Sequence, residues 1–304
     1  MSASDYDLIV VGEGIAGLAC AARAAAAGLR VATFEAEFFG GLVTNVNDLE
    51  DFPEAEGRSG MELAAGYKKA NAKAGVASFQ AQVTGVDAAG DGIAVLADEA
   101  TYRARALVVA SGARLKRLGV PGEAELQGRG VSQCADCDGP LFGGKDVVVA
   151  GGGDSAAQEA LVLAGLCRTV TIVHREAALR ARPHFAVRLA AASNVTLLGN
   201  AAVEAIRGRD GVEAVVVRDL ADGGLRELAC AGVFPYVGLE PNADFIPPTV
   251  PRDAAGFLLV DASLETKLTS VWAIGQARAG FGGLLRDATE DAARVVQQIR
   301  ERLG

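Results

Sequence analysis

The sequence is short of positive charge and of long apolar runs. Its 304 residues include 29 Lys and Arg against 38 Asp and Glu, which gives a formal net charge of −9 at pH 7. Nucleic-acid-binding chains usually carry a basic patch or stripe, so this balance argues against that class. The apolar stretch at residues 8–27 is interrupted by glycines and charged residues, and no basic segment precedes it. We therefore expect no leader peptide and no membrane span, which needs about 18 apolar residues in a row.

Cysteine is also scarce, with five residues in the chain. Cys134 and Cys137 form one C-x-x-C, while Cys20, Cys167 and Cys230 stand alone in apolar surroundings. Small secreted domains that depend on disulfides carry a denser cysteine framework. The pattern instead indicates a cytoplasmic protein with one catalytic pair and three buried thiols.

Residues 6–35 and 145–174 are two copies of one pattern. The first copy reads YDLIVVGEGIAGLACAARAAAAGLRVATFE and the second reads KDVVVAGGGDSAAQEALVLAGLCRTVTIVH. Each copy has a short β-branched apolar run, a glycine turn, a helical segment and a second apolar run. The repeat therefore predicts two strand–helix–strand units.

The small residues of each copy match a dinucleotide-binding fingerprint. They are Gly12, Gly14 and Gly17 in the first copy, and Gly151, Gly153 and Ala156 in the second. The first glycine permits the tight turn, the second lets the backbone approach a pyrophosphate, and the third position lets helix and strand pack closely. The phosphates then face the helix N-terminus. A glycine-rich turn of another α/β protein is the alternative for one copy, but two copies favour two bound nucleotides.

The residue that ends the second strand distinguishes the two nucleotides. Glu35 ends it in the first copy, where a carboxylate accepts hydrogen bonds from ribose hydroxyls, as FAD requires. His174 occupies this place in the second copy, and Arg175 and Arg180 follow. Positive charge there favours a 2′-phosphate and hence NADPH. Glu176 argues the other way and leaves NADH possible.

The C-x-x-C spacing brings Cys134 and Cys137 within disulfide reach. If residues 135–138 begin a helix, its N-terminus would favour a thiolate. A zinc site is the first alternative, but the chain has no second C-x-x-C and only two histidines to complete it. A buried, inert pair is the second alternative. Two nucleotide folds and a dithiol together could carry electrons in sequence from a nicotinamide to a flavin and then to a disulfide.

Two helices have clear end signals. Ser59, with Glu62 three residues later, predicts a capping box and a helix to about Ala74 that ends at Gly75. The apolar spacing near the C-terminus predicts a second helix from about residue 284 to residue 303.

With these motifs the chain resembles the low-molecular-weight thioredoxin reductases, and also the reductase portion of the alkyl hydroperoxide reductase flavoprotein. The resemblance covers nearly the whole chain and includes GEGIAG at 12–17, CADCDG at 134–139, GGGDSAAQEA at 151–160, HREAALR at 174–180 and VWAIG at 271–275. It implies an α/β fold with two Rossmann-like nucleotide-binding domains of three-layer β/β/α type, the second inserted into the first. Residues 1–114 and 246–304 would form the FAD domain, and residues 115–245 the NAD(P)H domain with the C-x-x-C.

The resemblance also implies roles for the residues of the CADCDG segment. Cys137 would face the flavin, and Cys134 would attack the external partner. Asp138 would be the general acid–base for the leaving thiolate. The implied partner is thioredoxin or a similar small protein, and the implied assembly is a homodimer.

Further cofactor contacts follow by motif position. For FAD the implied residues are Gly12, Gly14, Ile15, Ala16, Gly17, Glu35, Gly41, Leu42, Asp51, Val83, Ala110, Ser111, Gly112, Gly275, Gln276, Arg286, Asp287 and Ala288. For NADPH they are Gly151, Gly153, Asp154, Ser155, Ala156, His174, Arg175 and Arg180.

Some of these residues depart from the family pattern. Leu42 stands in place of Gln, Asp51 in place of Asn, and Gln276 in place of the Asp that holds the ribityl chain. Asp287 stands in place of Gln and adds a carboxylate that would disfavour an anionic reduced flavin. Glu176 replaces an Arg, which would weaken NADPH binding.

Three functions follow from this sequence. The first is a reductase that passes hydride from NADPH to FAD and electrons onward to the Cys134–Cys137 disulfide. The second is an FAD-dependent dithiol oxidase, or a reductase with another electron donor. The third is a flavoprotein without turnover, which would need neither both thiols nor Asp138.

Overall fold

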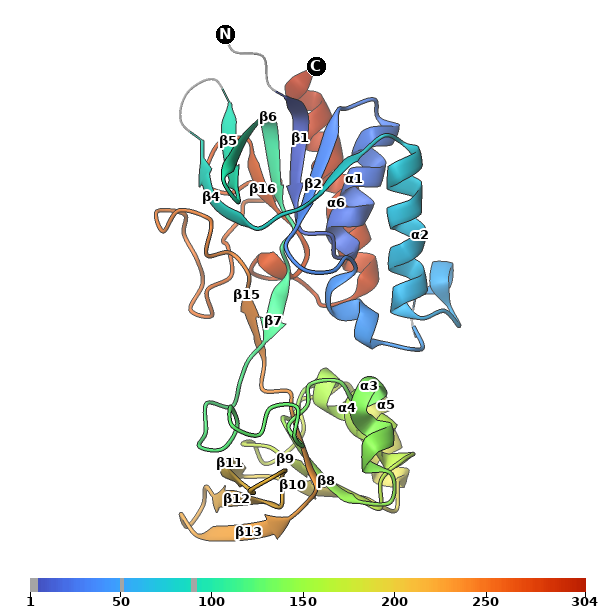
Figure 1. The fold of residues 1–304 in the computed structure, drawn as a ribbon, viewed down its shortest axis with the longest axis vertical. Coiled ribbons are helices and arrows are strands. Elements are labelled where there is room, and N and C mark those ends of the chain that lie inside the picture. Colours follow the sequence, from blue (N-terminus) through green and yellow to red (C-terminus); the bar gives the residue numbers. More distant parts are fainter. Residues whose placement is uncertain (1–4, 50–51, 89–91) are drawn as a thin grey trace. The chain divides into compact units, whose positions relative to one another are not determined.

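The structure, a computed structural model, describes residues 5–49, 52–88 and 92–304. The chain divides into two compact units, unit 1 with residues 1–114 and 240–304, and unit 2 with residues 115–239. Each unit is built on a parallel sheet with helices beside it (Figure 1). The α/β class with two Rossmann-like domains, expected from the repeat, is confirmed.

Unit 1 is a three-layer domain. Its strands are β1 (Tyr6–Val11), β2 (Val31–Glu35), β3 (Ala77–Gln80), β4 (Val83–Asp87), β5 (Ile93–Ala97), β6 (Ala100–Val109) and β16 (Val271–Ala273). Its helices are α1 (Ile15–Ala26), α2 (Gly60–Lys73) and α6 (Leu285–Leu303), with short 3-10 turns η1 (Gly41–Asn45), η2 (Pro53–Ala55) and η4 (Gly275–Ala277). Strands β3, β2, β1, β6 and β16 pair in parallel, while β4, β5 and the start of β6 form an antiparallel layer.

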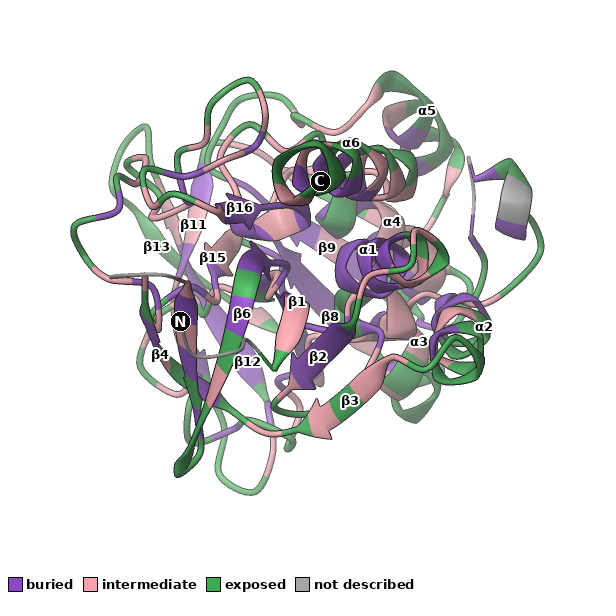
Figure 2. Cartoon of the chain, turned by 90° about the horizontal axis from the view of Figure 1, so that it is seen from above, coloured by how far each residue is buried: buried purple, intermediate pink, exposed green. Residues whose placement is uncertain are grey.

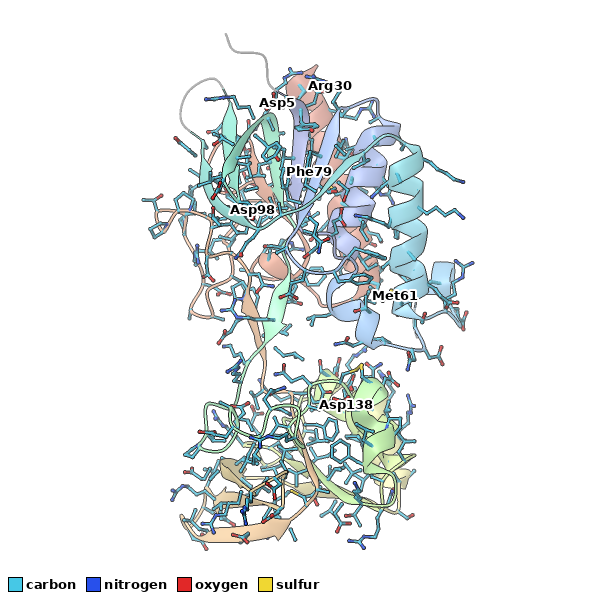
Figure 3. All side chains as sticks on the ribbon, in the orientation of Figure 1. Asp5, Arg30, Met61, Phe79, Asp98 and Asp138 are labelled. Carbon is cyan, nitrogen blue, oxygen red and sulfur yellow. A yellow bond between two sulfur atoms is a disulfide. The ribbon has the colours of Figure 1, made fainter. Side chains whose placement is uncertain are left out.

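The apolar run of β1 explains this layering. Leu8 and Val10 pack on the helical side, and Ile9 and Val11 pack on the side of the antiparallel layer. Both faces of the strand are thus buried, as in parallel sheets generally. Helix α1 is mostly buried, whereas α2 and α6 expose one face to solvent (Figure 2). On the other side of the sheet, Phe79 stacks on Phe34, with a ring-centroid distance of 5.0 Å (Figure 3).

Unit 2 repeats the three-layer plan on a smaller scale. Its strands are β8 (Asp146–Ala150), β9 (Thr169–Val173), β10 (Val195–Leu198), β11 (Ala201–Arg207), β12 (Ala214–Asp219), β13 (Leu225–Ala229) and β14 (Gly232–Pro235). Its helices are α3 (Ala135–Asp138), α4 (Asp154–Ala164) and α5 (Pro183–Ala191), and the 3-10 turn η3 (Gly139–Phe142) follows α3. Strands β10, β9, β8 and β14 form a parallel sheet, and β11, β12 and β13 form an antiparallel one. Val147 and Val149 face the helices, and Val148 and Ala150 face the antiparallel sheet.

The second unit boundary lies earlier than the sequence predicts. Two segments connect the units, β7 (Ala113–Leu115) and β15 (Leu239–Pro241), and they pair with each other. The compact units meet at 239/240 rather than 245/246. The reason is that Asn242 donates its backbone N–H to the Gly112 carbonyl at 3.0 Å and Ala243 is fully buried in the unit 1 core.

Both helices with predicted end signals are present. Ser59 caps α2, with its hydroxyl accepting from the Glu62 N–H at 3.2 Å and the Glu62 carboxylate accepting from the Ser59 N–H at 2.9 Å. Helix α6 spans the predicted C-terminal segment. Within the described ranges, no helix combines the length and apolarity needed to cross a membrane.

Candidate active site

The first glycine loop joins β1 to α1. Gly12 has φ +102, and a Cβ at this position would lie 2.3 Å from the Ala110 carbonyl oxygen. A Cβ on Gly17 would lie 2.0 Å from the Gly12 carbonyl oxygen. Packing within the protein therefore requires both glycines. Gly14 differs, because the nearest described atom to a Cβ there would be the Gly40 carbonyl oxygen, at 3.8 Å. The loop thus leaves its middle glycine open to an outside group, as a pyrophosphate requires.

The carboxyl ends of four parallel strands lie around this loop. Gly12 follows β1, Glu35 ends β2, the segment 110–112 follows β6, and Gly275 follows β16 closely. In open α/β sheets ligands bind at this edge. Ser111, in the predicted FAD set, has a buried hydroxyl oxygen without a hydrogen-bond partner among the described residues. Such a group needs a partner, which a bound ligand can supply.

Glu35 is partly engaged by the loop itself. Its carboxylate accepts hydrogen bonds from the Glu13 N–H at 2.8 Å and the Glu37 N–H at 3.1 Å. Two carboxylate oxygens have about four acceptor sites, so acceptor capacity remains for ribose hydroxyls.

The other residues predicted to contact FAD are distributed as follows. Ile15 and Ala16 are buried in the first turn of α1, Val83 is buried in β4, Gly41 and Leu42 lie in η1, Gln276 lies in η4, and Arg286, Asp287 and Ala288 lie in the first turn of α6. Leu42 is 41% exposed. Asp51 lies outside the described residues. The Asp287 carboxylate accepts a hydrogen bond from the Leu284 N–H at 3.1 Å, so it caps α6.

Sequence reasoning missed two buried charged groups of unit 1. Glu13, the middle residue of the loop, is 2% exposed and accepts from Thr33 and Ser78 hydroxyls while pairing with Lys68. Asp291 on α6 accepts from the Gly275 N–H at 2.9 Å and from Arg278. A signal for Asp291 was present, because it interrupts the apolar stripe of Ala288, Ala292 and Val295.

The second glycine loop joins β8 to α4 in the same manner. Gly151 has φ +141, and a Cβ there would lie 2.2 Å from the Tyr236 carbonyl oxygen. A Cβ on Gly153 would meet no atom of the described residues within 4 Å. Ala156 is buried, and Asp154 and Ser155 form the first turn of α4. The Asp154 carboxylate is bound by Arg182, another residue that sequence reasoning missed, with an Nε–Oδ2 distance of 2.7 Å. The middle glycine is again the open position.

The basic residues after β9 occupy different environments. His174 is 5% exposed, and its Nδ1 atom has no partner among the described residues. Burial lowers the pKa of His174, which favours its neutral form. The Arg180 guanidinium pairs with Glu176, at 3.0 Å between Nε and Oε1. Arg175 is exposed. Of the three predicted positive charges, one is therefore suppressed by burial and another is paired with a carboxylate.

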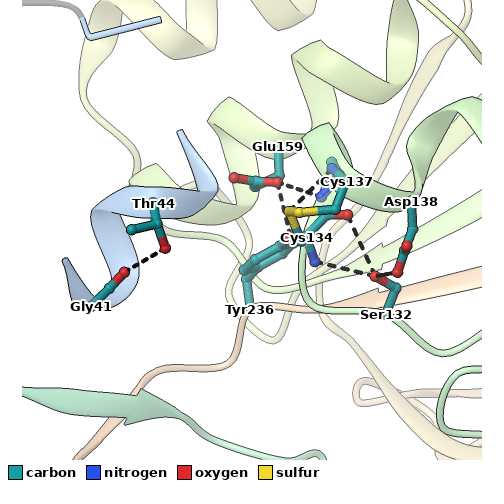
Figure 4. Close-up of a disulfide and its surroundings, with 9 residues drawn as sticks. Gly41, Thr44, Ser132, Cys134, Cys137, Asp138, Glu159 and Tyr236 are labelled. Carbon is teal, nitrogen blue, oxygen red and sulfur yellow. Dashed lines mark hydrogen bonds between the residues drawn. A yellow bond between two sulfur atoms is a disulfide. The ribbon is translucent and has the colours of Figure 1, made fainter. Parts of the chain in front are cut away.

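Cys134 and Cys137 form a disulfide, with the two Cα atoms 5.3 Å apart (Figure 4). Residues 135–138 form α3, as the sequence predicts, and Cys134 is its N-cap. The Cys137 N–H donates a hydrogen bond to the Cys134 sulfur, with 3.1 Å between the nitrogen and Sγ. Cys137 is exposed and Cys134 is half-buried.

Asp138 stands at the end of the same turn. Its carboxylate accepts a hydrogen bond from the buried Ser132 hydroxyl at 2.6 Å, and that hydroxyl oxygen also accepts from the Cys134 N–H at 3.2 Å (Figure 4). Ser132, which sequence reasoning missed, thereby links the acid to the backbone of the first cysteine. The arrangement can break and form a disulfide and can hold a proton close to it.

The remaining thiols are of another kind. Cys20, Cys167 and Cys230 are free and buried. Burial raises the pKa of Cys20 to about 12 and that of Cys230 to about 12. Because the thiolate is the reactive form, these buried thiols are unreactive, and Cys134 and Cys137 are the candidates for redox chemistry.

Comparison with known proteins finds similarity over both units. The family model described as pyridine nucleotide-disulphide oxidoreductase matches residues 6–298. A thioredoxin reductase of Treponema pallidum (strain Nichols) is 37% identical over 291 residues, which cover 95% of this chain and 94% of that protein. A thioredoxin reductase of Bacillus subtilis (strain 168) is 34% identical over 97% of this chain and 94% of that protein. The crystal structure of Lactococcus lactis thioredoxin reductase (FR conformation) matches with a TM-score of 0.94 and 30% identity, covering 98% of each chain.

Proposed function

The chain belongs to the pyridine nucleotide-disulphide oxidoreductase family as a thioredoxin reductase-like flavoprotein, and on that premise we propose that it uses FAD and NADPH to reduce a protein disulfide through Cys134 and Cys137. The observation that carries this proposal is the disulfide itself, placed in unit 2 with an acid at the end of its turn. The resemblance predicted from the sequence motifs is thereby confirmed.

The residues of unit 1 fit FAD. The open backbone at Gly14 suits the pyrophosphate, and Glu35 has acceptor sites left for the ribose. Ser111 offers a hydroxyl that has no partner among the residues the structure describes. Gln276 would supply an amide in place of the carboxylate that the family uses at the ribityl chain. When bound, FAD would accept a hydride from NADPH and pass two electrons to the disulfide.

The residues of unit 2 fit a pyridine nucleotide. Gly153 leaves room for the pyrophosphate, and the N-terminus of α4 lies directly behind it. Arg175 is the exposed cation that we assign to a 2′-phosphate. Because Glu176 holds Arg180, we expect weaker discrimination against NADH than three available cations would give.

The chemistry of the dithiol follows from its neighbours. The Cys134 thiolate attacks one sulfur of the partner disulfide, and the other partner sulfur leaves as a thiolate that takes a proton from Asp138. Cys137 then attacks the Cys134 sulfur, which re-forms the internal disulfide and releases the second partner thiol. The Cys137 N–H supports the first step, because it donates to the sulfur that must carry the negative charge.

We assign thioredoxin or a similar small redox protein as the partner, since the relatives are named thioredoxin reductases. A homodimer in the cytoplasm is part of the same proposal and rests on the family resemblance alone.

One observation favours a second function. The Glu176–Arg180 pair removes charge from the place where the 2′-phosphate would bind. A reductase with another electron donor, or an FAD-dependent dithiol oxidase, would have no need of that charge. The intact second glycine loop and Arg175 favour the NADPH-dependent reaction over this alternative.

Turnover distinguishes the two functions. The purified holoenzyme should reduce a thioredoxin disulfide with NADPH, and a Cys134→Ser variant should lose this activity. If the wild-type protein instead consumes oxygen with a dithiol substrate and gives no NADPH oxidation, the oxidase is the correct function.

A further inference from the structure

Glu159 is a carboxylate beside the disulfide that the proposed reaction does not use. It lies on α4, and its Oε2 atom accepts a hydrogen bond from the Ala135 N–H at 2.8 Å and from the Tyr236 hydroxyl at 2.9 Å (Figure 4). Ala135 directly follows Cys134 and is the first residue of α3. The carboxylate is therefore hydrogen-bonded to the peptide N–H that directly follows Cys134, the cysteine that attacks the partner.

The groups that face Glu159 do not neutralise its charge. Tyr236 follows β14, Asp136 lies on α3, and neither is a cation. Burial raises the pKa of Glu159, the hydrogen bonds from Ala135 and Tyr236 act in the opposite direction, and the charge of Asp136 adds to the rise. No lysine or arginine of the described residues is paired with this carboxylate.

Two backbone N–H groups of this turn donate to two different acceptors. The Cys137 N–H is directed at the Cys134 sulfur, which favours a thiolate there. The Ala135 N–H donates to the Glu159 carboxylate instead, so it does not donate to that sulfur. A nearby carboxylate also disfavours a thiolate by like-charge repulsion. Glu159 thus opposes the stabilisation that Cys137 provides.

We propose that Glu159 is a positioning residue that holds the Cys134 turn through Ala135 and whose negative charge opposes ionisation of the reduced Cys134 thiol. The inference rests on the proposed role of Cys134 as the attacking sulfur. A less stabilised thiolate is more nucleophilic, but a smaller fraction of the thiol is then ionised, so the charge of Glu159 sets the balance between the population and the nucleophilicity of the Cys134 thiolate. Hydrogen bonding and charge are separable here, because a glutamine at this position keeps an acceptor oxygen and loses the charge.

The test reads the thiol of Cys134 directly. In a full-length Cys137→Ser background, the rate of alkylation by iodoacetamide is followed against pH, and the adduct on Cys134 is identified by mass spectrometry. Adding Glu159→Gln should lower the midpoint of the pH profile by about half a unit to one unit, because a like charge is removed. Glu227→Gln is the matched control, since Glu227 is exposed and pairs with Arg207. Glu227 lies on β13, and Figure 1 shows β13 and α3 on opposite sides of unit 2. It should leave the midpoint unchanged.

A second variant separates charge from a general disturbance of the turn. Tyr236→Phe removes one hydrogen bond of the same carboxylate and leaves the carboxylate in place, so the midpoint should fall by less than in Glu159→Gln. An unchanged midpoint in Glu159→Gln, or an equal fall in Tyr236→Phe, overturns the inference. The assay needs no nucleotide and no partner protein. Failure to reduce thioredoxin would therefore contradict the proposed function without moving this result.

Discussion

At the scale of single residues, the two cysteines are distinguished by their contacts. Cys137 is exposed, whereas Cys134 is half-buried and receives the Cys137 N–H. Exposure favours Cys137 as the attacking sulfur, and thiolate stabilisation favours Cys134. We give greater weight to the second, because the thiolate is the reacting species and reactivity begins with its population at neutral pH.

Trapping the mixed disulfide tests this assignment. A Cys137→Ser variant keeps the attacking sulfur and lacks the one that resolves the intermediate, so it should accumulate a covalent complex with a thioredoxin. A Cys134→Ser variant should accumulate little. The complexes are quantified on a non-reducing gel, with the double variant as the blank. A stronger band from Cys134→Ser would reverse the roles.

The pair of Glu176 and Arg180 sets a second prediction at this scale. Glu176→Arg removes a carboxylate from the 2′-phosphate region and releases Arg180, so kcat/KM for NADPH should rise about tenfold, since charge-assisted contacts to phosphate are strong. The value for NADH, which lacks that phosphate, should stay nearly constant. Steady-state kinetics with both nucleotides gives the ratio. An equal change for both nucleotides would mean that Glu176 does not affect recognition of the 2′-phosphate.

Residue identity predicted some of these features and not others. The spacing of Cys134 and Cys137 predicted a bonded pair, because one turn of chain fixes their separation. The burial of His174 and the contact between Glu159 and Ala135 could not be predicted. Both depend on where separate segments meet in the fold, and no local pattern carries that information.

At the scale of elements, the glycines of the first loop have two different tasks. Gly12 and Gly17 are required by contacts within the protein, whereas Gly14 leaves space for a ligand. Gly14 has φ −67, which any residue adopts, so neither strain nor packing within the protein explains its presence. The loop therefore permits a test in which folding and cofactor binding respond separately.

Gly17→Ala should destabilise the protein by about 1–3 kcal/mol through overpacking, seen as a lower midpoint of thermal unfolding. Gly14→Ala should fold with nearly the wild-type midpoint as apoprotein and bind FAD at least about tenfold more weakly, a loss of about 1.4 kcal/mol.

Gly66→Ala on α2 is the matched control, because a Cβ there meets none of the atoms that the structure describes within 4 Å. It should leave FAD binding unchanged and slightly raise stability, as expected for alanine in a helix. Wild-type FAD affinity in Gly14→Ala would remove the main support for the pyrophosphate site.

Local signals predicted the elements better than the boundaries between units. The capping box at Ser59 and the apolar stripe of α6 gave both helices within a residue or two, because helix ends are set by nearby hydrogen bonds. The return from unit 2 to unit 1 was placed six residues too late, at 245/246 instead of 239/240. The sequence gives no sign that Asn242 is bonded to Gly112, which lies far away in the chain.

At the scale of the whole molecule, two nucleotide-binding units and one disulfide make up the chain. Unit 1 offers an open glycine loop and the Ser111 hydroxyl, which has no partner within the described part of the chain, and unit 2 offers a second open loop together with the disulfide. The repeat in the sequence predicted this duplication. The differences between the copies, Glu35 against His174 above all, predicted that the two nucleotides are not the same.

Electron transfer from NADPH through FAD to the Cys134–Cys137 disulfide is tested most directly by an anaerobic titration of the purified yellow protein with NADPH, followed by flavin absorbance. NADPH should bleach the flavin rapidly, and addition of oxidised thioredoxin should restore the absorbance. A Cys134→Ser variant should bleach and fail to transfer its electrons to thioredoxin. Absence of bleaching by NADPH and by NADH, with bleaching by a dithiol, would contradict an NADPH-dependent reductase and identify a dithiol oxidase.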